Sequence, residues 1–302
     1  MIYPNVFVII VTYNGMRWYD SCFNSLRQSS IPVQTIVVDN ASNDGTSEYI
    51  KEHFPEIYLI DSHENIGFGR ANNLAMRYAL DNRCDYVFLL NQDTWVEPDS
   101  IENLINLHKQ FPFYGVLSPM HIRADGKSLY IQIEDGSKDH GNKLLGDCYF
   151  GQLEDIYPFT YVNAAAWLIP KETLEIVGGF DPIFPLYGED DDYINRLRFH
   201  GLQLGLCPKI KIIHDHQSVP NPLSSGILRD YYTTIVGLID PNKDNTLRQY
   251  MFHLFTKGIK CCLHGKFKQV SQLKHEYDFL AKKRADIERS RRINSIKQPS
   301  WL

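Results

Sequence analysis

The chain has 302 residues, of which 43% are apolar and 22% charged, and its formal net charge is −5. These values are ordinary for a globular protein and exclude a disordered or fibrous chain, while so mild a charge indicates no partner by itself. The length suits one α/β domain with an appendage, or two domains.

Short apolar runs alternate with segments of helical periodicity over the first 120 residues. The runs predict strands that are covered on both faces. Strands that alternate with helices are typical of βαβ units and a mainly parallel sheet. The predicted strands are Val6–Val11, Thr35–Asp39, Ile57–Asp61 and Tyr86–Leu90. The predicted helices are Trp18–Gln28, Thr46–His53, Arg70–Leu80 and Ser100–Gln110, with Asp44 as the N-cap of the second.

The alternation loosens between Gly115 and Tyr161, where turns such as Ala124-Asp125-Gly126 and Glu134-Asp135-Gly136 separate short strand-like pieces. This stretch indicates a mixed-sheet region rather than another βα repeat. We predict two further helices, each followed by a glycine that ends it, over Lys171–Val177 and Asp191–His200. After Pro220–Pro222 the composition becomes helical, basic and aromatic.

Charge divides the chain unevenly. Residues 1–220 carry a net charge of −13 and residues 221–302 a net charge of +8. An acidic body with a basic tail indicates an anionic partner, either lipid headgroups or nucleic acid. A solvated helical tail is the alternative. An overall acidic body disfavours nucleic acid, because nucleic-acid binders usually present a basic face.

No segment predicts export or membrane insertion. The run Val6–Val11 follows no basic residue and is too short for a signal peptide. No stretch approaches the roughly 18 apolar residues of a membrane span. The six cysteines form no CxxC pair, which is typical of reduced thiols. We therefore expect a cytoplasmic protein, soluble or peripheral at the inner face of the membrane.

A polar cluster follows each predicted strand. The clusters are Thr12-Tyr13-Asn14-Gly15, residues 39–45, residues 64–69 and Asn91-Gln92-Asp93. Each alone resembles an ordinary turn. Ligands bind at the carboxyl ends of strands in open α/β sheets, so four clusters at one edge predict a nucleotide site. No G-x-G-x-x-G follows the first strand and no P-loop is present, which disfavours a dehydrogenase or nucleotidyltransferase.

Several motifs, taken in order, resemble glycosyltransferase family 2 over roughly residues 5–220. They are V-T-Y-N at 11–14, V-V-D-N-A-S-N-D-G-T at 37–46, N-I-G-F-G-R-A-N-N at 65–73, L-L-N-Q-D-T at 89–94, G-G-F-D at 178–181 and G-E-D-D-D-Y-I-N-R at 188–196. The nearest pattern within the family is the rhamnosyltransferase-like branch. The resemblance implies an α/β GT-A fold, a Rossmann-like mixed sheet flanked by helices, here with a helical C-terminal extension.

The resemblance also implies which residues bind the donor. Thr12, Tyr13, Asn14 and Asp39 would line the nucleobase pocket, which Asp44 and Asn65 would help to shape. Gly67 and Gly69 would let their loop approach the donor, and Arg70 would meet its phosphate or base. Asn91-Gln92-Asp93 occupies the place of the family's D-x-D metal motif, and its first acid is replaced by asparagine.

The implied cofactor is a divalent cation, Mg²⁺ or Mn²⁺, held by Asp93 and the donor diphosphate. Such ions accept few protein ligands when waters and phosphates complete their coordination, and they neutralise a departing diphosphate. His214 matches a late histidine that contacts metal or diphosphate in many GT-A enzymes, with His216 as the fallback. A surface or core histidine is the alternative for His214.

The second half of the catalytic region would bind the acceptor. Asp190 matches the family's general base, which takes the proton of the attacking hydroxyl, and Glu189 would orient the acceptor or the base. Asp192 and Arg196 are four residues apart and read as a structural pair. Tyr187 and Trp167 are candidate acceptor contacts, with a core position as the alternative for Trp167.

We therefore predict a catalytic domain over residues 1–220, with a donor half to about 115 and an acceptor half from 116, and a basic extension over 221–302. The predicted activity is inverting sugar transfer to a saccharide, free or lipid-linked, in bacterial cell-surface polysaccharide synthesis. dTDP-rhamnose is the first donor, with UDP-galactose or UDP-N-acetylglucosamine as alternatives. A non-catalytic nucleotide-sugar-binding module is the rival function. The extension is expected to contact a membrane, pack on the body or form a homodimer.

Overall fold

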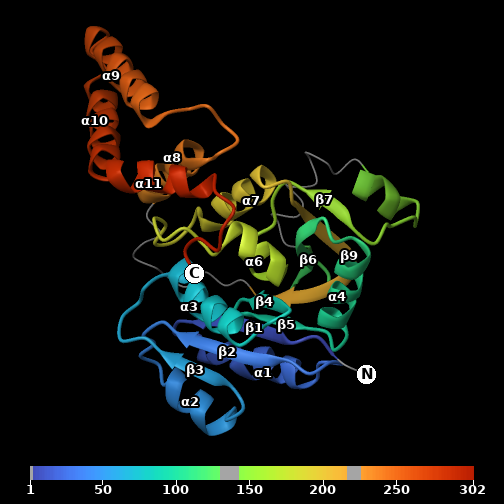
Figure 1. The fold of residues 1–302 in the computed structure, drawn as a ribbon. Coiled ribbons are helices and arrows are strands. Elements are labelled where there is room, and N and C mark those ends of the chain that lie inside the picture. Colours follow the sequence, from blue (N-terminus) through green and yellow to red (C-terminus); the bar gives the residue numbers. More distant parts are fainter. Residues whose placement is uncertain (1–2, 130–142, 216–225) are drawn as a thin grey trace.

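A computed structural model describes residues 3–129, 143–215 and 226–302 (Figure 1). His216, the turn at Glu134-Asp135-Gly136 and the Pro220–Pro222 boundary lie outside the described residues. One nine-stranded sheet forms the centre of the body, which is the part of the chain before the C-terminal extension. The strand order is β3-β2-β1-β4-β8-β6-β9-β5, with β7 paired to β9.

The N-terminal half of the sheet is parallel. It contains β1 (Val6–Thr12), β2 (Gln34–Asp39), β3 (Tyr58–Asp61) and β4 (Tyr86–Leu90). Val6, Val8 and Ile10 of β1 pack into one apolar layer and Phe7 and Ile9 into the other. Both faces of β1 are therefore buried, and this is why its sequence is an unbroken apolar run.

The other half of the sheet is mixed. It contains β5 (Thr94–Val96), β6 (Tyr114–Arg123), β7 (Tyr157–Phe159), β8 (Ala166–Pro170) and β9 (Gln203–His214). Strand β8 is antiparallel to both β4 and β6, whereas β6 and β9 are parallel. The change of direction at β8 confirms the predicted mixed-sheet region.

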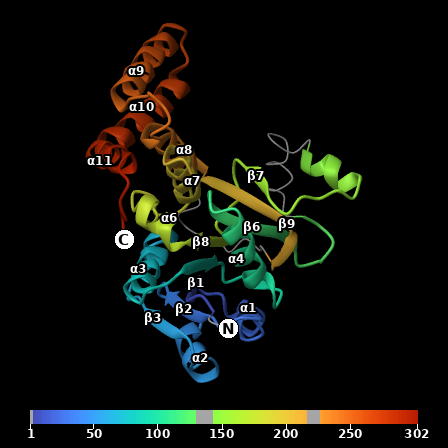
Figure 2. The same cartoon turned by 45° about the vertical axis from the view of Figure 1, so that its right-hand side comes forward.

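Helices cover both faces of the sheet (Figures 1 and 2). Side chains of α1 (Tyr19–Arg27), α2 (Thr46–His53) and α4 (Ser100–Gln110) pack in one apolar layer. Those of α3 (Phe68–Asp81), α6 (Lys171–Val177) and α7 (Glu189–Phe199) pack in the other. A 3₁₀ turn, η1 (Met16–Trp18), precedes α1, and residues 143–149 are also helical.

Most predicted elements match the observed ones within a few residues, and α2, α4, α6 and β4 match at both ends. The predicted cap of α2 is wrong by one residue. Gly45 is the N-cap, with a left-handed φ of 87°. Asp44 still stabilises the first turn, because its Oδ1 accepts a hydrogen bond from the backbone N–H of Thr46 at 3.3 Å.

The C-terminal extension contains α8 (Gly226–Ile239), α9 (Leu247–Leu263), α10 (Phe267–Lys282) and α11 (Arg284–Asn294). Tyr232 and Ile235 of α8 pack against Ile183 and Phe184 of the body in a third apolar cluster. Helices α9 and α10 form a hairpin that projects away from the body (Figures 1 and 2). No helix within the described ranges is long and apolar enough to cross a bilayer.

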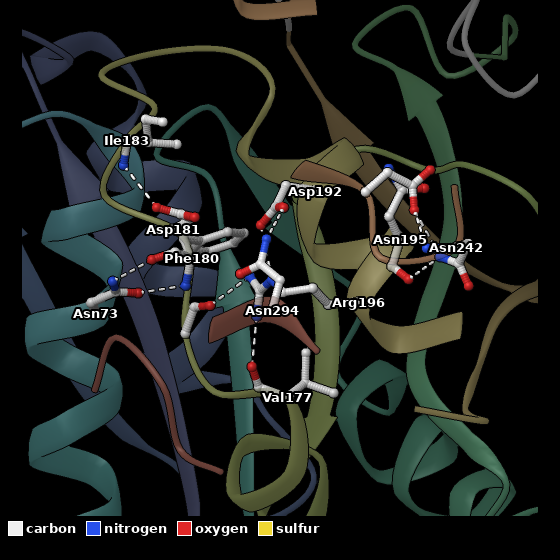
Figure 3. Close-up of polar contacts among 12 residues, drawn as sticks. Asn73, Val177, Phe180, Asp181, Ile183, Asp192, Asn195, Arg196, Asn242 and Asn294 are labelled. Carbon is white, nitrogen blue, oxygen red and sulfur yellow. Dashed lines mark hydrogen bonds and ion pairs between the residues drawn. The ribbon is translucent and has the colours of Figure 1, made fainter. Parts of the chain in front are cut away.

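A buried ionic network joins the extension to α7 (Figure 3). Nε of Arg196 donates to Oδ2 of Asp192 at 2.8 Å, and both side chains are almost fully buried. Nη1 and Nη2 of Arg196 donate to the carbonyls of Val177 and Gly179. Oδ1 of Asp192 accepts from Nδ2 of Asn294 at 2.9 Å. The Asp192–Arg196 pair is thus structural, as predicted, and it also fixes α11 to the body.

We expect Arg196→Met to lower the free energy of unfolding by about 3–5 kcal/mol, because the substitution leaves the Asp192 carboxylate buried without its cation. Urea unfolding followed by circular dichroism measures this loss. Lys209→Met is the control, since it removes an exposed ion pair with Asp155 and should cost less than about 1 kcal/mol. Equal losses in the two variants would contradict this role of Arg196.

Candidate functional site

Parallel pairing places the polar ends of β1 and β2 side by side. Thr12 and Asp39 are register partners, and Oγ1 of Thr12 donates to Oδ1 of Asp39 at 2.8 Å. The hydroxyl and backbone N–H of Ser42 also donate to this carboxylate. Asp39 is therefore buried and rigidly held. The Ser47 hydroxyl also approaches its Oδ2 at 3.4 Å, so these donors take up about the four acceptor positions of a carboxylate. A nucleobase N–H would have to replace one of them.

Hydrogen bonds join the loops that follow β1, β2 and β4. Gln92 clamps the backbone of Tyr13, because its Oε1 accepts from the Tyr13 N–H at 2.9 Å and its Nε2 donates to the Tyr13 carbonyl at 3.2 Å. A Cβ at Gly15 would lie 2.3 Å from the same Oε1, which explains the glycine. Asn14 accepts from the N–H of Asn43 through its Oδ1 at 2.9 Å. Gln92 and Asn14 thus hold the predicted donor loops together.

Asp44, Asn65 and Gly67 shape neighbouring loops. Asp44 accepts from the backbone N–H of Met16 at 3.2 Å. Oδ1 of Asn65 accepts from Asn40 at 2.9 Å and from the N–H of Gly67 at 3.0 Å. A Cβ at Gly67 would lie 2.3 Å from the carbonyl oxygen of Pro185. Close packing against the loop before α7 is therefore a sufficient reason for this glycine.

The predicted metal residues meet where β5 pairs with the end of β9. Thr94 is the register partner of His214, and Oδ1 of Asp93 lies 3.4 Å from Nε2 of His214. Both residues are buried. The backbone N–H of Asp215 donates to the Asp93 carbonyl at 2.9 Å and fixes this crossing. Residues more than a hundred positions apart in the sequence thus form the predicted pair.

The acidic run opens α7. Gly188 caps the helix with a φ of 100°, and Tyr187 before it also has a left-handed φ of 66°. Oδ2 of Asp190 accepts from the N–H of Ala164 at 3.2 Å. Within the described residues, Oδ1 of Asp190 and Oε2 of Glu189 are buried and have no hydrogen-bond partner. Each therefore has an unused acceptor position.

Burial raises the pKa of both acids. The pKa of Asp190 rises to about 7, with the charge of Asp191 adding to the effect and the Ala164 N–H opposing it. The pKa of Glu189 rises to about 8 through burial and the neighbouring charge of Asp190. A carboxyl group poised near neutral pH is suited to general acid–base chemistry.

A cavity of about 350 Å³ lies between the ends of β4 and β9 and the start of α7, and the predicted nucleobase residues Thr12, Tyr13, Asn14 and Asp39 do not line it. Asn91 and His214 line it together with Glu189, Asp190 and Tyr187, as do other residues from the same loops and helices: Phe68, Tyr161, Asn163, Ala164, Ala165, Leu186, Gly188, Asp191, Arg229 and Thr233. Asn91 of the 91–93 loop and the acids at 189–190 thus lie around one cavity, and Asp93 adjoins it through His214. This juxtaposition is the geometric requirement on which the predicted activity depends.

Two predicted contacts are placed differently. Trp167 is fully buried and packs against Phe180 and Tyr193, so its ring has no face open to a sugar and the core alternative is correct. Arg70 donates to the carbonyl of Pro182 at 2.9 Å and lines a separate cavity of about 140 Å³ beside the extension. The structure therefore places Arg70 outside the cavity that contains Asp190.

The sequence analysis did not identify Arg229 and Thr233, which reach the cavity from α8. The guanidinium of Arg229 lies 5.4 Å from the ring centroid of Tyr187. Burial raises the pKa of Asp191, and the positive charge of Arg229 partly opposes this rise. No local signal pointed to these residues, because they belong to an extension without a recognisable motif.

The family model of glycosyl transferase family 2 matches residues 7–164. Curated relatives include a hexosyltransferase of low-salt glycan biosynthesis from Haloferax volcanii, 25% identical over 69% of this chain and 66% of that protein. A dTDP-rhamnosyl transferase from Shigella flexneri is 24% identical over 70% of this chain and 69% of its own length. An N-acetylglucosaminyl-diphospho-decaprenol L-rhamnosyltransferase from Mycobacterium tuberculosis is 25% identical over 77% of this chain and 83% of its own length.

Among solved structures, the mannosyltransferase from Pyrobaculum calidifontis in complex with GDP-Man and Mn²⁺ is similar in fold. Its TM-score is 0.55 at 18% sequence identity, and the match covers 94% of this chain and 76% of that one. At this identity the likeness concerns the fold alone. Together with the mixed sheet and its flanking helices, it confirms the predicted GT-A architecture.

Proposed function

Because the chain belongs to glycosyl transferase family 2, we propose that it transfers a sugar from a nucleotide-diphosphate donor to a saccharide hydroxyl, with inversion at the anomeric carbon. One observation supports this most directly. Asp190 lines the same cavity as Asn91 and His214, and its Oδ1 is buried without a hydrogen-bond partner among the described residues. A donor diphosphate and an acceptor hydroxyl can therefore face each other across the sugar.

Asp190 is the base in this proposal. Its Oδ1 takes the proton as the acceptor oxygen bonds to the anomeric carbon and the bond from that carbon to the diphosphate oxygen breaks. The Ala164 N–H holds the other oxygen of the carboxylate, which fixes its orientation. Glu189 borders the same cavity and orients the acceptor. Single displacement needs no covalent nucleophile.

Asp93 and His214 would hold a divalent cation. An oxygen and a nitrogen that converge to 3.4 Å are suitable ligands, although no group of three or more His, Cys, Asp or Glu side chains in the described ranges is arranged to hold a metal ion. The pair fits a cation whose remaining ligands are water and substrate phosphate. Such an ion neutralises charge that develops on the departing diphosphate.

The donor in this proposal is dTDP-rhamnose, and the product is a bacterial cell-surface polysaccharide. Rhamnosyl transfer by two of the relatives supports the choice of sugar. We expect dTDP-rhamnose with Mn²⁺ to raise the melting temperature more than UDP-galactose or UDP-N-acetylglucosamine. At a hundredfold excess over its Kd a ligand stabilises the fold by about 2.7 kcal/mol.

Differential scanning fluorimetry measures these shifts, with dTDP and free rhamnose as controls. A larger shift with a UDP-sugar would overturn the donor and leave the reaction class in place. No shift with any nucleotide sugar would contradict the proposed function itself.

The acceptor in this proposal carries a phosphate, as a lipid-linked saccharide does, and Arg229 binds it. The name of the mycobacterial relative, which includes a diphospho-decaprenol, supports this acceptor class. Arg229 is the cation that α8 contributes to an otherwise acidic cavity. A guanidinium is well suited to phosphate, since its planar donors bind two oxygens at once.

We expect Arg229→Ala to raise the KM for a diphosphate-linked acceptor about tenfold or more, because a hydrogen-bonded charge contributes about 1.5–3 kcal/mol. The KM for the donor should not change. Initial-rate kinetics separate the two constants. Arg248→Ala is the control, since this exposed arginine of the same extension lines a different cavity. An unchanged acceptor KM would remove Arg229 from the acceptor site.

A further inference from the structure

The projecting α9–α10 hairpin exposes large apolar side chains. Leu263 and Phe267, on either side of its turn, are 79% and 72% exposed, and Phe252 and Phe255 are 67% and 60% exposed. Phe252, Phe255, Ile259 and Leu263 follow one another at intervals of three and four residues, so they form one stripe along α9. Exposed apolar surface of this extent, outside any core, marks an interaction site.

The same part of the hairpin is uniformly basic. Residues 255–274 contain five lysines and no aspartate or glutamate. All five are exposed, and the ion pairs found in the described part of the chain involve other lysines, such as Lys209 and Lys243. Lys266 and Lys268 flank Phe267 at the turn. This part of the hairpin, residues 255–274, therefore carries uncompensated positive charge, in contrast to the acidic catalytic body.

We propose that the tip of the α9–α10 hairpin, residues 252–268, docks on an anionic membrane surface. Leu263 and Phe267 enter the interface between headgroups and acyl chains, and Lys266 and Lys268 lie against lipid phosphates. Apolar side chains interleaved with lysines are the composition of interfacial helices. A second copy of the tip is a poor partner, because like charges would face each other. This inference does not depend on the identity of the sugar donor.

Co-sedimentation of the full chain with vesicles tests the proposal. We expect binding to phosphatidylcholine vesicles that contain phosphatidylglycerol, little binding to phosphatidylcholine alone, and weaker binding at high salt, since salt screens the attraction. The double variant Leu263→Ser/Phe267→Ser should bind at least about tenfold more weakly, because two buried apolar side chains are lost. Lys266→Glu/Lys268→Glu should remove the preference for anionic lipid.

The matched control is Tyr58→Ser/Phe113→Ser, which removes two exposed rings from the catalytic body and should bind vesicles as the unaltered chain does. Failure of the unaltered chain to bind anionic vesicles, or equal weakening in the control, would overturn the proposal. So would a dimer in sedimentation velocity that Leu263→Ser/Phe267→Ser dissociates without any vesicle binding. Transfer to a soluble acceptor should persist in the tip variants, which separates this inference from the proposed activity.

Discussion

Asp190→Asn is expected to lower kcat by about 100- to 10,000-fold, the usual contribution of a general base, while the Kd for the nucleotide sugar stays the same. The amide preserves the shape of the side chain and loses the basic carboxylate oxygen that takes the proton in the proposed mechanism. Single-turnover kinetics measure the first quantity and calorimetric titration of the donor measures the second. A simultaneous loss of donor affinity would indicate a positioning role instead.

Asp191→Asn is the matched control. It removes the same charge one residue further along α7, where the carboxylate interacts with Arg229 and Arg198. We expect only a small change in kcat at high pH. Equal losses in both variants would mean that the negative charge of the run matters and that no single base exists.

The pH profile gives a second, independent test of the same residue. Asp190 accepts a proton only when it is ionised, and burial raises its pKa to about 7. We therefore expect kcat/KM, which reports ionisation of the free enzyme, to fall about tenfold for each pH unit below that value. In Asp191→Asn the profile should shift to lower pH, because the charge of Asp191 helps to raise the pKa of Asp190. A profile that is flat between pH 5 and 8 would contradict the assignment.

Stability should change in the opposite direction to activity. A carboxyl group whose pKa is higher in the folded chain than in the unfolded chain stabilises the fold only at low pH, and this contribution is lost as pH rises through the folded value. Asp190→Asn removes the cost of an ionised, buried carboxylate above pH 7. We expect its melting temperature to equal or exceed that of the unaltered chain there, which excludes misfolding as the cause of inactivity.

Removal of divalent cations is expected to lower the transfer rate by about 100-fold or more, since neutralising charge on a departing diphosphate contributes several kcal/mol. Activity assays in EDTA measure this effect, and titration with Mg²⁺ or Mn²⁺ shows which ion restores the rate. Full activity in EDTA would mean that Asp93 and His214 act without a cation.

The role of Asp93 can be tested with a variant. Asp93→Asn should raise the cation concentration that gives half-maximal activity, because the Asp93–His214 pair loses its charged oxygen ligand. Asp99→Asn is the matched control, since Asp99 precedes α4 on the same segment and its Oδ2 accepts only from Asn103 in the described structure. Equal metal dependence in both variants would place the cation elsewhere.

Local periodicity was sufficient to predict the alternating strands and helices from β1 to β4 and the helices α4, α6 and α7. The runs at β1, β2 and β4 are apolar because both faces of these strands are covered, and this burial is visible in the sequence itself. Errors fell at the ends of elements, such as the cap of α2, where the left-handed conformation of Gly45 and not the side chain of Asp44 begins the helix. End positions depend on single backbone angles, which periodicity does not report.

The sequence by itself determined the fold class and the family, and it predicted polar residues for the candidate site, since strand ends, motif order and an acidic run are local features. Only the tertiary structure decided that Trp167 belongs to the core, that Arg70 faces the extension and that Arg229 reaches the cavity. It also divided the basic tail into helices that pack on the body, through contacts such as Asn294 with Asp192, and a hairpin that projects from it. The physical reason is separation along the chain. These contacts join segments that lie far apart in the sequence, 102 residues in the case of Asn294 and Asp192, and no pattern within either segment specifies the other.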